Sequence, residues 1–189
     1  MASAVPIRDA AHVHAFLAYF RQQGQYRNLV MATMGIHAAL RIGDMLSLRV
    51  KDVYDLKNRR VLDTITITEQ KTGKSKTIEL HHNIKEALEL YLPNVTNPDE
   101  PLFINKRTKK AISRVQAYRI IGEAAKAVNI PHKVCCHSLR KTFGYHAWKK
   151  GTSPVLIMEI YNHSSYNTTK RYLGITQDDK NAIYRNLNI

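Results

Sequence analysis

A histidine and an arginine three positions apart form the first pattern in this sequence that could do chemistry. His137 and Arg140 are separated by Ser138-Leu139. If the segment opens a helix, residues three apart lie on one face, so the imidazole and the guanidinium can converge on one ligand. Arginine presents a planar fork that matches phosphate or carboxylate oxygens, and imidazole can carry a proton near neutral pH. Taken alone the pattern is weak, because many basic proteins carry it on a solvated surface.

Other reactive side chains stand at intervals along the rest of the chain. Arg41 follows an apolar stretch and has Asp44 three positions on, a pair that could be purely structural. Lys71 lies in a Lys-Thr-Gly-Lys turn, His163 in a polar loop and Tyr172 in a helical segment. Considered singly, each has a plain structural interpretation as a surface lysine, a loop histidine or a packing tyrosine. Only their combination can indicate a function.

The elements that must position these side chains are mostly helices. Apolar residues recur at helical spacing in the segment that ends before Gly24, and Pro93 stops a later helix. Asp44, directly after a glycine, is a candidate N-cap of a short third helix. The other helices are expected over residues 9–22, 26–40, 83–92, 113–128, 138–149, 154–161, 168–173 and 178–187.

Between residues 60 and 80 the pattern changes to period two. Ile65 and Ile67 face one side of a strand, the threonines around them face the other side, and the alternation resumes at Thr77. This pattern predicts an antiparallel hairpin whose tip is residues 71–74. Together with the helices it predicts an α+β fold that is mainly α with one small antiparallel β-sheet. A length of 189 residues suits one domain.

In chain order, the reactive residues resemble the motif of the tyrosine recombinase, or phage integrase, family. That motif runs arginine, lysine, His-x-x-Arg, histidine or tryptophan, and tyrosine, and the matching residues are Arg41, Lys71, His137, Arg140, His163 and Tyr172. The resemblance extends from about Tyr26 to Tyr172. It is most specific in residues 35–48, in the His-x-x-Arg motif, and in residues 163–172, where a serine pair follows the histidine. It implies the fold of that family's catalytic domain.

The resemblance implies a transesterification in which Tyr172 attacks a DNA phosphodiester and forms a covalent 3′-phosphotyrosine intermediate. A phenol, with a reference pKa of about 10, needs help in losing its proton. By the resemblance, His137 accepts or relays that proton and His163 donates to a phosphate oxygen. Three other tyrosines are rival nucleophiles, but only Tyr172 has the family's spacing from His163. The rivals are Tyr161, Tyr166 and Tyr184.

The same resemblance gives Arg41 and Arg140 the role of a phosphate clamp, because guanidinium forks suit the equatorial oxygens better than ammonium does. Lys71 protonates the departing 5′ oxygen as general acid, with Lys74 in the same turn as the alternative. Asp44 orients Arg41 or the histidine of the His-x-x-Arg motif. No metal or other cofactor is implied, since one phosphodiester replaces another.

The composition favours a polyanionic partner. Lys and Arg number 29 against 15 Asp and Glu, so the formal net charge is +14. No apolar run is long enough to cross a membrane, and the N-terminus lacks the apolar core of a signal peptide. Cys135 and Cys136 are adjacent, which fits a reducing compartment, and their spacing from His132 and His137 matches no metal-ligand pattern. We therefore expect a cytoplasmic, nucleoid-associated protein.

The family likeness also implies partners and domain boundaries. We expect double-stranded DNA as the partner and a homo-oligomer, a tetramer, on paired sites, with accessory proteins unidentified. Because the pattern begins near Tyr26, residues 1–189 are expected to be a single catalytic domain without the family's usual N-terminal DNA-binding domain. The tail, residues 173–189, contains an apolar stripe made of Ile183, Tyr184 and Leu187. This stripe could dock on a neighbouring protomer or pack on its own domain.

Two other functions stay open at this point. Type IB topoisomerases resemble the family in chemistry, but they tend to have lysine where His137 stands. Supercoil relaxation by a monomer, without recombination between sites, would indicate such an enzyme. The other alternative is a basic DNA-binding module with a relic catalytic pattern, although every position of the motif is filled here. A pure binding module would form no covalent bond with DNA.

Overall fold

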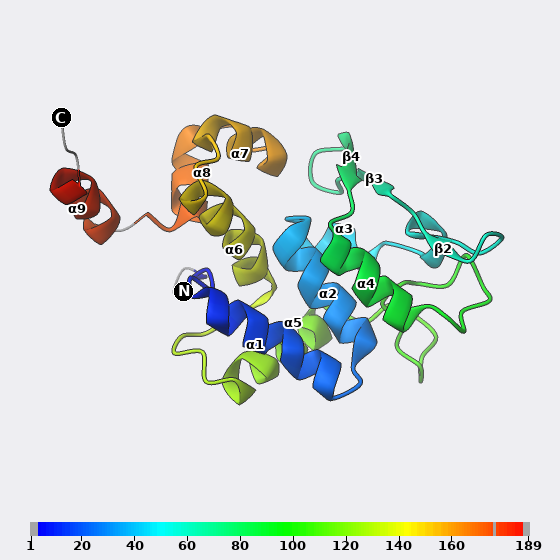
Figure 1. The fold of residues 1–189 in the computed structure, drawn as a ribbon. Coiled ribbons are helices and arrows are strands. Elements are labelled where there is room, and N and C mark those ends of the chain that lie inside the picture. Colours follow the sequence, from blue (N-terminus) through cyan, green and yellow to red (C-terminus); the bar gives the residue numbers. More distant parts are fainter. Residues whose placement is uncertain (1–3, 176, 187–189) are drawn as a thin grey trace.

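The computed structural model describes residues 4–175 and 177–186, which form a mainly helical fold with small antiparallel sheets (Figure 1). The α+β class expected from the sequence is confirmed. None of the helices in this part of the chain is long and apolar enough to cross a membrane. The helices are α1 (Ala10–Gln22), α2 (Tyr26–His37), α3 (Ile42–Leu46), η1 (Val50–Asp52), α4 (His82–Tyr91), α5 (Arg114–Ala127), α6 (Cys136–Lys149), α7 (Pro154–Tyr161), α8 (Tyr166–Leu173) and α9 (Gln177–Asn186).

The strands form two ladders where the sequence predicts one. Strand β1 (Tyr54–Asp55) pairs with β2 (Arg60–Val61), and β3 (Thr64–Thr68) pairs with β4 (Ser75–Glu79). The tip of the β3–β4 hairpin therefore spans residues 69–74, which is longer than the predicted 71–74. Backbone hydrogen bonds close this wider tip: the Gly73 N–H donates to the carbonyl of Glu69 over 2.8 Å.

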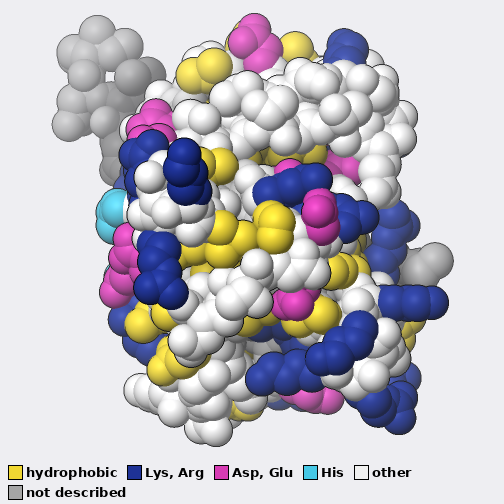
Figure 2. Space-filling view, turned by 90° about the vertical axis from the view of Figure 1, so that its right-hand side faces the viewer, with side chains coloured by type: hydrophobic (Ala, Val, Ile, Leu, Met, Phe, Trp, Pro, Cys, Tyr) yellow, Lys and Arg dark blue, Asp and Glu magenta, His cyan; other side chains and the backbone are white. Residues whose placement is uncertain are grey.

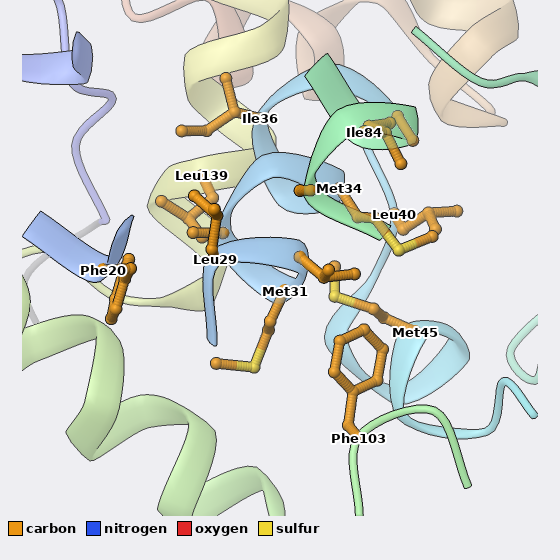
Figure 3. Close-up of a cluster of buried hydrophobic side chains, with 14 of the residues drawn as sticks. Phe20, Leu29, Met31, Met34, Ile36, Leu40, Met45, Ile84, Phe103 and Leu139 are labelled. Atoms are coloured by element: carbon orange, nitrogen blue, oxygen red, sulfur yellow. The ribbon is translucent and has the colours of Figure 1, made fainter. Parts of the chain in front are cut away.

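Helix α2 lies at the centre of the hydrophobic core. It is buried from Asn28 to Ile36 and packs against α1, α4 and α6. Figure 3 shows its side chains surrounded by Phe20 of α1, Ile84 of α4 and Leu139 of α6. Gly35 permits the close approach to α6, since a Cβ there would lie 2.9 Å from Leu139 Cδ1. This contact brings the C-terminal end of α2 next to the helix that carries the His-x-x-Arg motif.

Helix α2 also ends earlier than its apolar spacing predicts. The expected helix runs over residues 26–40, but α2 stops at His37, and Ala39 has a positive φ of 53°. The buried Ala39 carbonyl accepts a hydrogen bond from Nη1 of Arg140. The chain consequently turns before Arg41, which becomes the N-cap residue of α3. A tertiary contact to a carbonyl leaves no trace in helical periodicity, so the sequence could not predict this turn.

A second hydrophobic cluster joins α6, α7 and α8. Its buried members are Ala39, Ile157, Tyr161 and Leu173. Helix α7 ends at Asn162, which adopts a left-handed conformation with a φ of 52°. Asparagine tolerates this conformation better than most residues, because its short polar side chain can bond locally. The turn sets His163 beside α8, and Tyr172 packs at the edge of the cluster.

Helix α9 extends the chain beyond α8 (Figure 1). An ion pair links it to α6, in which Nζ of Lys149 lies 2.6 Å from Oδ1 of Asp179. Tyr184 on this helix has 83% of its surface exposed. The side chain of Ile183 and the whole of Leu187 lie outside the described residues, so the apolar stripe of the tail stays a prediction.

Candidate active site

A cavity of about 540 Å³ opens between the α2–α3 connection, the β3–β4 tip and the N-terminal ends of α5 and α6. Five of the six expected catalytic residues line it, and so does Asp44. His163 is outside the lining but touches it through the ring of Tyr172, 4.5 Å away between centroids. The complete lining is Leu40, Arg41, Ile42, Gly43, Asp44, Gln70, Lys71, Arg114, Cys136, His137, Arg140 and Tyr172. Segments far apart in the sequence thus meet at one place.

The two arginines are held by the C-terminal end of α7. Arg140 is 1% exposed and donates Nη2 to the carbonyl of Tyr161 over 2.9 Å, while its Nη1 donates to Ala39. Arg41 donates Nη2 to the same Tyr161 carbonyl over 3.3 Å. The last carbonyls of a helix have no partner within the helix and carry a partial negative charge, so they suit cations. Carbonyl acceptors therefore fix the guanidinium of Arg140 without neutralising it, and one of them also holds Arg41.

Aromatic packing fixes the guanidinium of Arg140 from a second side. Its Cζ lies 4.5 Å from the centroid of the Tyr161 ring, and the Tyr161 hydroxyl donates to the Arg140 carbonyl over 2.5 Å. Burial, and secondly the charge of Arg41, lower the pKa of Arg140, but a guanidinium stays protonated in proteins. Nε of Arg140 is buried and has no hydrogen-bond partner in the described part of the chain. Its N–H group is therefore not used by the contacts that hold the guanidinium in place.

Arg41 faces two carboxylates. Its Nη1 lies 2.6 Å from Oε2 of Glu69 and 3.9 Å from Oδ2 of Asp44. The main partner of Asp44 is on the hairpin instead, because Oδ1 accepts the backbone N–H of Gln70 over 3.0 Å. Asp44, which is 3% exposed, therefore ties the start of α3 to the hairpin tip. Within the described residues, no hydrogen bond joins Asp44 to His137.

The ring of Tyr172 lies among histidines. Centroid distances are 4.8 Å to His137 and 4.5 Å to His163, both edge-on, and Nζ of Lys141 lies 5.4 Å above the same ring. Partial burial, and then the neighbouring cations, lower the pKa of each histidine to about 4. Both imidazoles are consequently neutral near pH 7, and a neutral imidazole has one nitrogen that can accept a proton. His163 Nδ1 lies 3.0 Å from Oγ1 of Thr169.

Lys71 and Lys74 differ in position although they share one turn. Lys71 lines the cavity, whereas Lys74 does not. No hydrogen bond or ion pair holds the Lys71 amine within residues 4–175 and 177–186, so no side chain of that part of the chain competes with a ligand for it. Lys74 contributes backbone groups to the tip, where its carbonyl accepts from the Glu69 N–H over 3.0 Å.

The rival tyrosines lie elsewhere. Tyr161 is fully buried, and burial raises the pKa of its phenol above the ordinary value. Tyr166 is 47% exposed at the start of α8, and Tyr184 projects from α9. Neither lines the cavity, in contrast to Tyr172.

Comparison with known proteins decides the family. The model of the phage integrase family matches residues 9–178. The chain belongs to this family. A probable integrase/recombinase of Bacillus subtilis, YoeC, is 38% identical over 180 residues, which cover 95% of this chain and 94% of YoeC. The recognition of a tyrosine recombinase catalytic domain from the sequence is thereby confirmed.

More distant members of the phage integrase family are longer. A tyrosine recombinase of Thermosipho africanus is 23% identical over 168 residues, and the match covers 89% of this chain but 56% of that protein. The crystal structure of the XerA recombinase superposes with a TM-score of 0.79 at 20% identity, covering all of this chain and 66% of that one. The XerA likeness shows that the fold is shared. The chain thus spans between half and two thirds of these two recombinases.

Within this phage integrase site, several contributors carry no family motif and were not predicted. Glu69 pairs with Arg41, Asn162 and Lys76 bind Glu69, and Lys141 covers Tyr172. A signal for Glu69 did exist in the sequence, because it is in phase with Ile65 and Ile67 at period two and so shares their inward face. Lys141 and Asn162 had no comparable signal, since their roles depend on how α6, α7 and α8 pack together.

By the resemblance to the family, Gly43 stands where a serine or other small residue is often found. A Cβ at this position would lie 2.6 Å from Nη2 of Arg114 and 3.1 Å from Oε1 of Gln70. The absence of a side chain therefore leaves room for the guanidinium of Arg114, which begins α5, at the rim of the cavity. The sequence alone could not relate these positions because α3 and α5 are distant in the chain.

The one thiol that lines the cavity is a poor nucleophile. Cys135 and Cys136 are unpaired, and Cys136 lines the cavity beside His137. Burial raises the pKa of Cys136 to about 12, with the neighbouring Cys135 adding to the effect. A thiol with such a pKa is protonated at neutral pH and is a poor nucleophile. In the described residues no group of three or more His, Cys, Asp or Glu side chains is arranged to hold a metal ion.

Proposed function

We propose that this protein is a site-specific recombinase or integrase that cleaves and rejoins DNA strands through a covalent 3′-phosphotyrosine intermediate on Tyr172. The observation that carries the proposal is the convergence at one cavity of a tyrosine, two arginines, a histidine and a lysine, all in the order of the family motif. Membership of the phage integrase family supports the same conclusion.

The phosphate clamp consists of Arg41 and Arg140. As the phenolic oxygen attacks phosphorus, negative charge spreads over the equatorial oxygens, and preorganised donors stabilise this charge most effectively where water is excluded. The unpartnered Nε–H of Arg140 supplies one such donor. The first turn of α6 adds its free backbone N–H groups, since Cys136 and His137 line the same cavity.

The hydroxyl proton of Tyr172 passes to His137 as the phenolic oxygen attacks. The imidazole is neutral near pH 7 because its pKa is about 4, and it lies edge-on to the Tyr172 ring. Lys141 stabilises the phenolate as the proton leaves. When Thr169 donates its hydroxyl proton to Nδ1 of His163, the hydrogen of the neutral ring resides on Nε2, which then donates to a phosphate oxygen.

The leaving oxygen takes its proton from Lys71. The bond between phosphorus and the 5′ oxygen breaks as the bond between phosphorus and the Tyr172 oxygen forms, and the Lys71 ammonium protonates the 5′ oxygen. Attack by a 5′ hydroxyl on the phosphotyrosine reverses these transfers and restores the free tyrosine. One phosphodiester is exchanged for another in each step, so no external source of energy enters the balance.

Double-stranded DNA is the proposed partner, bound by a homotetramer on paired sites in the cytoplasm, at the nucleoid. The net charge of +14 favours such a polyanion. Figure 2 shows Lys and Arg side chains spread over one face of the molecule with Asp and Glu side chains between them. We further propose that residues 1–189 act as a single catalytic domain, since one hydrophobic cluster extends from Ile7 to Leu139.

The proposal is tested with a nicked suicide duplex carrying the native site of the protein. The parent protein should become covalently attached to the duplex, and peptide mapping should find the nucleotide on Tyr172. Tyr172→Phe should lose the adduct while DNA binding is retained, because only the nucleophilic oxygen is removed. Tyr166→Phe, in the same helix, is the matched control and should form the adduct normally. Adduct formation by Tyr172→Phe would contradict the assignment.

A further inference from the structure

Glu69 is the most deeply buried carboxylate of the site, and neither the family motif nor the proposed chemistry assigns it a role. It begins the hairpin tip, directly after β3, and is 1% exposed. It is absent from the cavity lining, so it cannot touch a DNA substrate there. A buried carboxylate is costly unless it is paired and hydrogen-bonded. The contacts of Glu69 show what offsets that cost.

The carboxylate accepts contacts from three segments that bear, or directly precede, a proposed catalytic group. Oε2 lies 2.6 Å from Nη1 of Arg41 and 3.0 Å from Nδ2 of Asn162, the residue before His163. The same oxygen accepts the hydroxyl of Thr72, next to Lys71 in the tip, over 3.0 Å. Three segments, the α2–α3 connection, the hairpin tip and the α7–α8 turn, therefore meet on one oxygen atom.

The second oxygen holds the hairpin against α7. Nζ of Lys76 lies 3.3 Å from Oε1 of Glu69 and 3.4 Å from the carbonyl of Ile160. Burial by itself would raise the pKa of Glu69, but Arg41, Asn162, Thr72 and Lys76 outweigh it and lower the pKa to about 2. The carboxylate is therefore charged whenever the protein is folded near neutral pH.

We infer that Glu69 is a positioning residue that sets the guanidinium of Arg41 and the Lys71 hairpin relative to the scissile phosphate. The inference rests on the proposed function of these two residues. Without the carboxylate, the charges of Arg41, Lys76 and Arg140 would repel one another, with Asp44 the one remaining acid within 4 Å of Arg41 among the described residues. The tip would also lose its side-chain contacts to Thr72 and Asn162.

The test compares Glu69→Gln with Glu79→Gln, which removes the same charge from an exposed position of the same hairpin. Single-turnover cleavage of the suicide duplex by Glu69→Gln should fall roughly 10- to 100-fold, the usual cost of removing a group that orients a functional one. Its DNA affinity should be retained, because every cation is still present. Glu79→Gln should cleave like the parent.

A substrate with a bridging 5′ phosphorothiolate separates the two parts of the inference. Its thiolate leaving group needs no general acid, so Lys71→Ala should recover fully on it. Glu69→Gln should recover only in part, because Arg41 is still misplaced. Full recovery would contradict the inference, since the carboxylate would then act on the hairpin alone. Parent-like cleavage of the ordinary duplex by Glu69→Gln would also overturn it.

A double variant distinguishes positioning from mere stability. Glu69→Gln combined with Lys76→Met removes the buried amine that the lost carboxylate leaves unpaired, so the melting temperature should return toward that of the parent. Cleavage should stay low, since Arg41 and the tip are still unattached. Recovery of cleavage together with the melting temperature would show that Glu69 serves stability alone. If the parent forms no adduct at all, the proposed function fails. If the parent forms the adduct and Glu69→Gln forms it equally well, the proposed function stands and only the inference about Glu69 fails.

Discussion

At the scale of single residues, the site depends on guanidinium groups that are buried and yet kept charged. Arg140 satisfies the carbonyls of Ala39 and Tyr161 through two different nitrogens. Those carbonyls lie at or just after the C-terminal ends of α2 and α7, where no N–H of the helix is available to them. The two Nη atoms of the guanidinium therefore have a structural role, and Nε is left without a partner in the described residues.

We predict that Arg140→Lys and Arg41→Lys both slow cleavage although they retain the charge. A single ammonium cannot replace the fork, so about 100-fold or more should be lost, as for other preorganised donors. Stability should separate the two variants: Arg140→Lys leaves a buried carbonyl unpaired at a cost of about 1–3 kcal/mol, whereas the Arg41 side chain is 24% exposed and its loss should cost less. Urea denaturation and single-turnover cleavage measure these effects. Normal cleavage by both variants would remove them from the clamp.

A histidine outside the cavity should make the protein sensitive to acid. His37 ends α2, its Nε2 lies 3.3 Å from Nδ2 of Asn83, and its ring stacks on that of His81. Burial, and then the positive charges of neighbouring groups, lower the pKa of His37 to about 4. Because the unfolded chain takes up this proton near pH 6.5, folding stability is unaffected above that pH and decreases as the pH falls toward 4.

We therefore predict that His37→Gln reduces the dependence of the melting temperature on pH between 6.5 and 4. The glutamine keeps an acceptor for Asn83 and takes up no proton. His14→Gln, at an exposed position of α1, is the control and should leave the dependence unchanged. An identical pH dependence in the parent and in His37→Gln would show that protonation of this residue does not oppose folding.

At the scale of elements, the sequence predicted what repeats and missed what depends on tertiary contact. The helices were found because their apolar residues recur at helical spacing, and the β3–β4 hairpin because Ile65 and Ile67 alternate with threonines. The early end of α2 at His37 was missed, since it follows from the Arg140 contact to Ala39. Pairing of β1 with β2 was missed as well, because strands of two residues are too short to show a period.

The site followed the same division. A motif with fixed spacing and order predicted which residues gather at the cavity, since each carries a reactive group. The groups that hold them have ordinary types and no fixed spacing. Asn162 is an example, because its value lies in a left-handed turn and one amide contact to Glu69. Such roles become apparent only when the elements are placed in space.

The α7–α8 turn provides a prediction about an element. Asn162→Gly keeps a residue that adopts the positive φ freely but loses the amide, whereas Asn162→Ala loses both. The alanine variant should be less stable than the glycine variant by about 1 kcal/mol, the cost of a left-handed conformation for a residue with a Cβ. Both should cleave more slowly than the parent because the contact to Glu69 is gone. Equal stability of the two variants, measured in urea, would show that the turn relaxes.

At the scale of the whole molecule, the proposed assembly on DNA raises the question of how one protomer would contact the next. None of the α9 side chains that the structure describes belongs to the hydrophobic core around α2. Lys149 and Asp179 form an ion pair between α6 and α9, and both Asp179 and Asn181 make further contacts. Tyr184 stays exposed. A helix with these properties is suited to bind another surface, and in an assembly that surface is a second protomer.

We predict that deletion of residues 176–189 leaves the domain folded and impairs its assembly on DNA. The melting temperature should change little, because none of the described side chains that are removed belongs to the main hydrophobic core. Adduct formation on an isolated site should persist, whereas cooperative assembly on paired sites, followed by gel mobility or sedimentation, should weaken. Lys149→Ala serves as the control for the ion pair within the chain: it removes this ion pair and leaves α9 in place, so assembly should be retained. If the truncated protein unfolds, α9 packs on its own domain, and if it assembles as well as the intact chain, α9 does not couple the protomers.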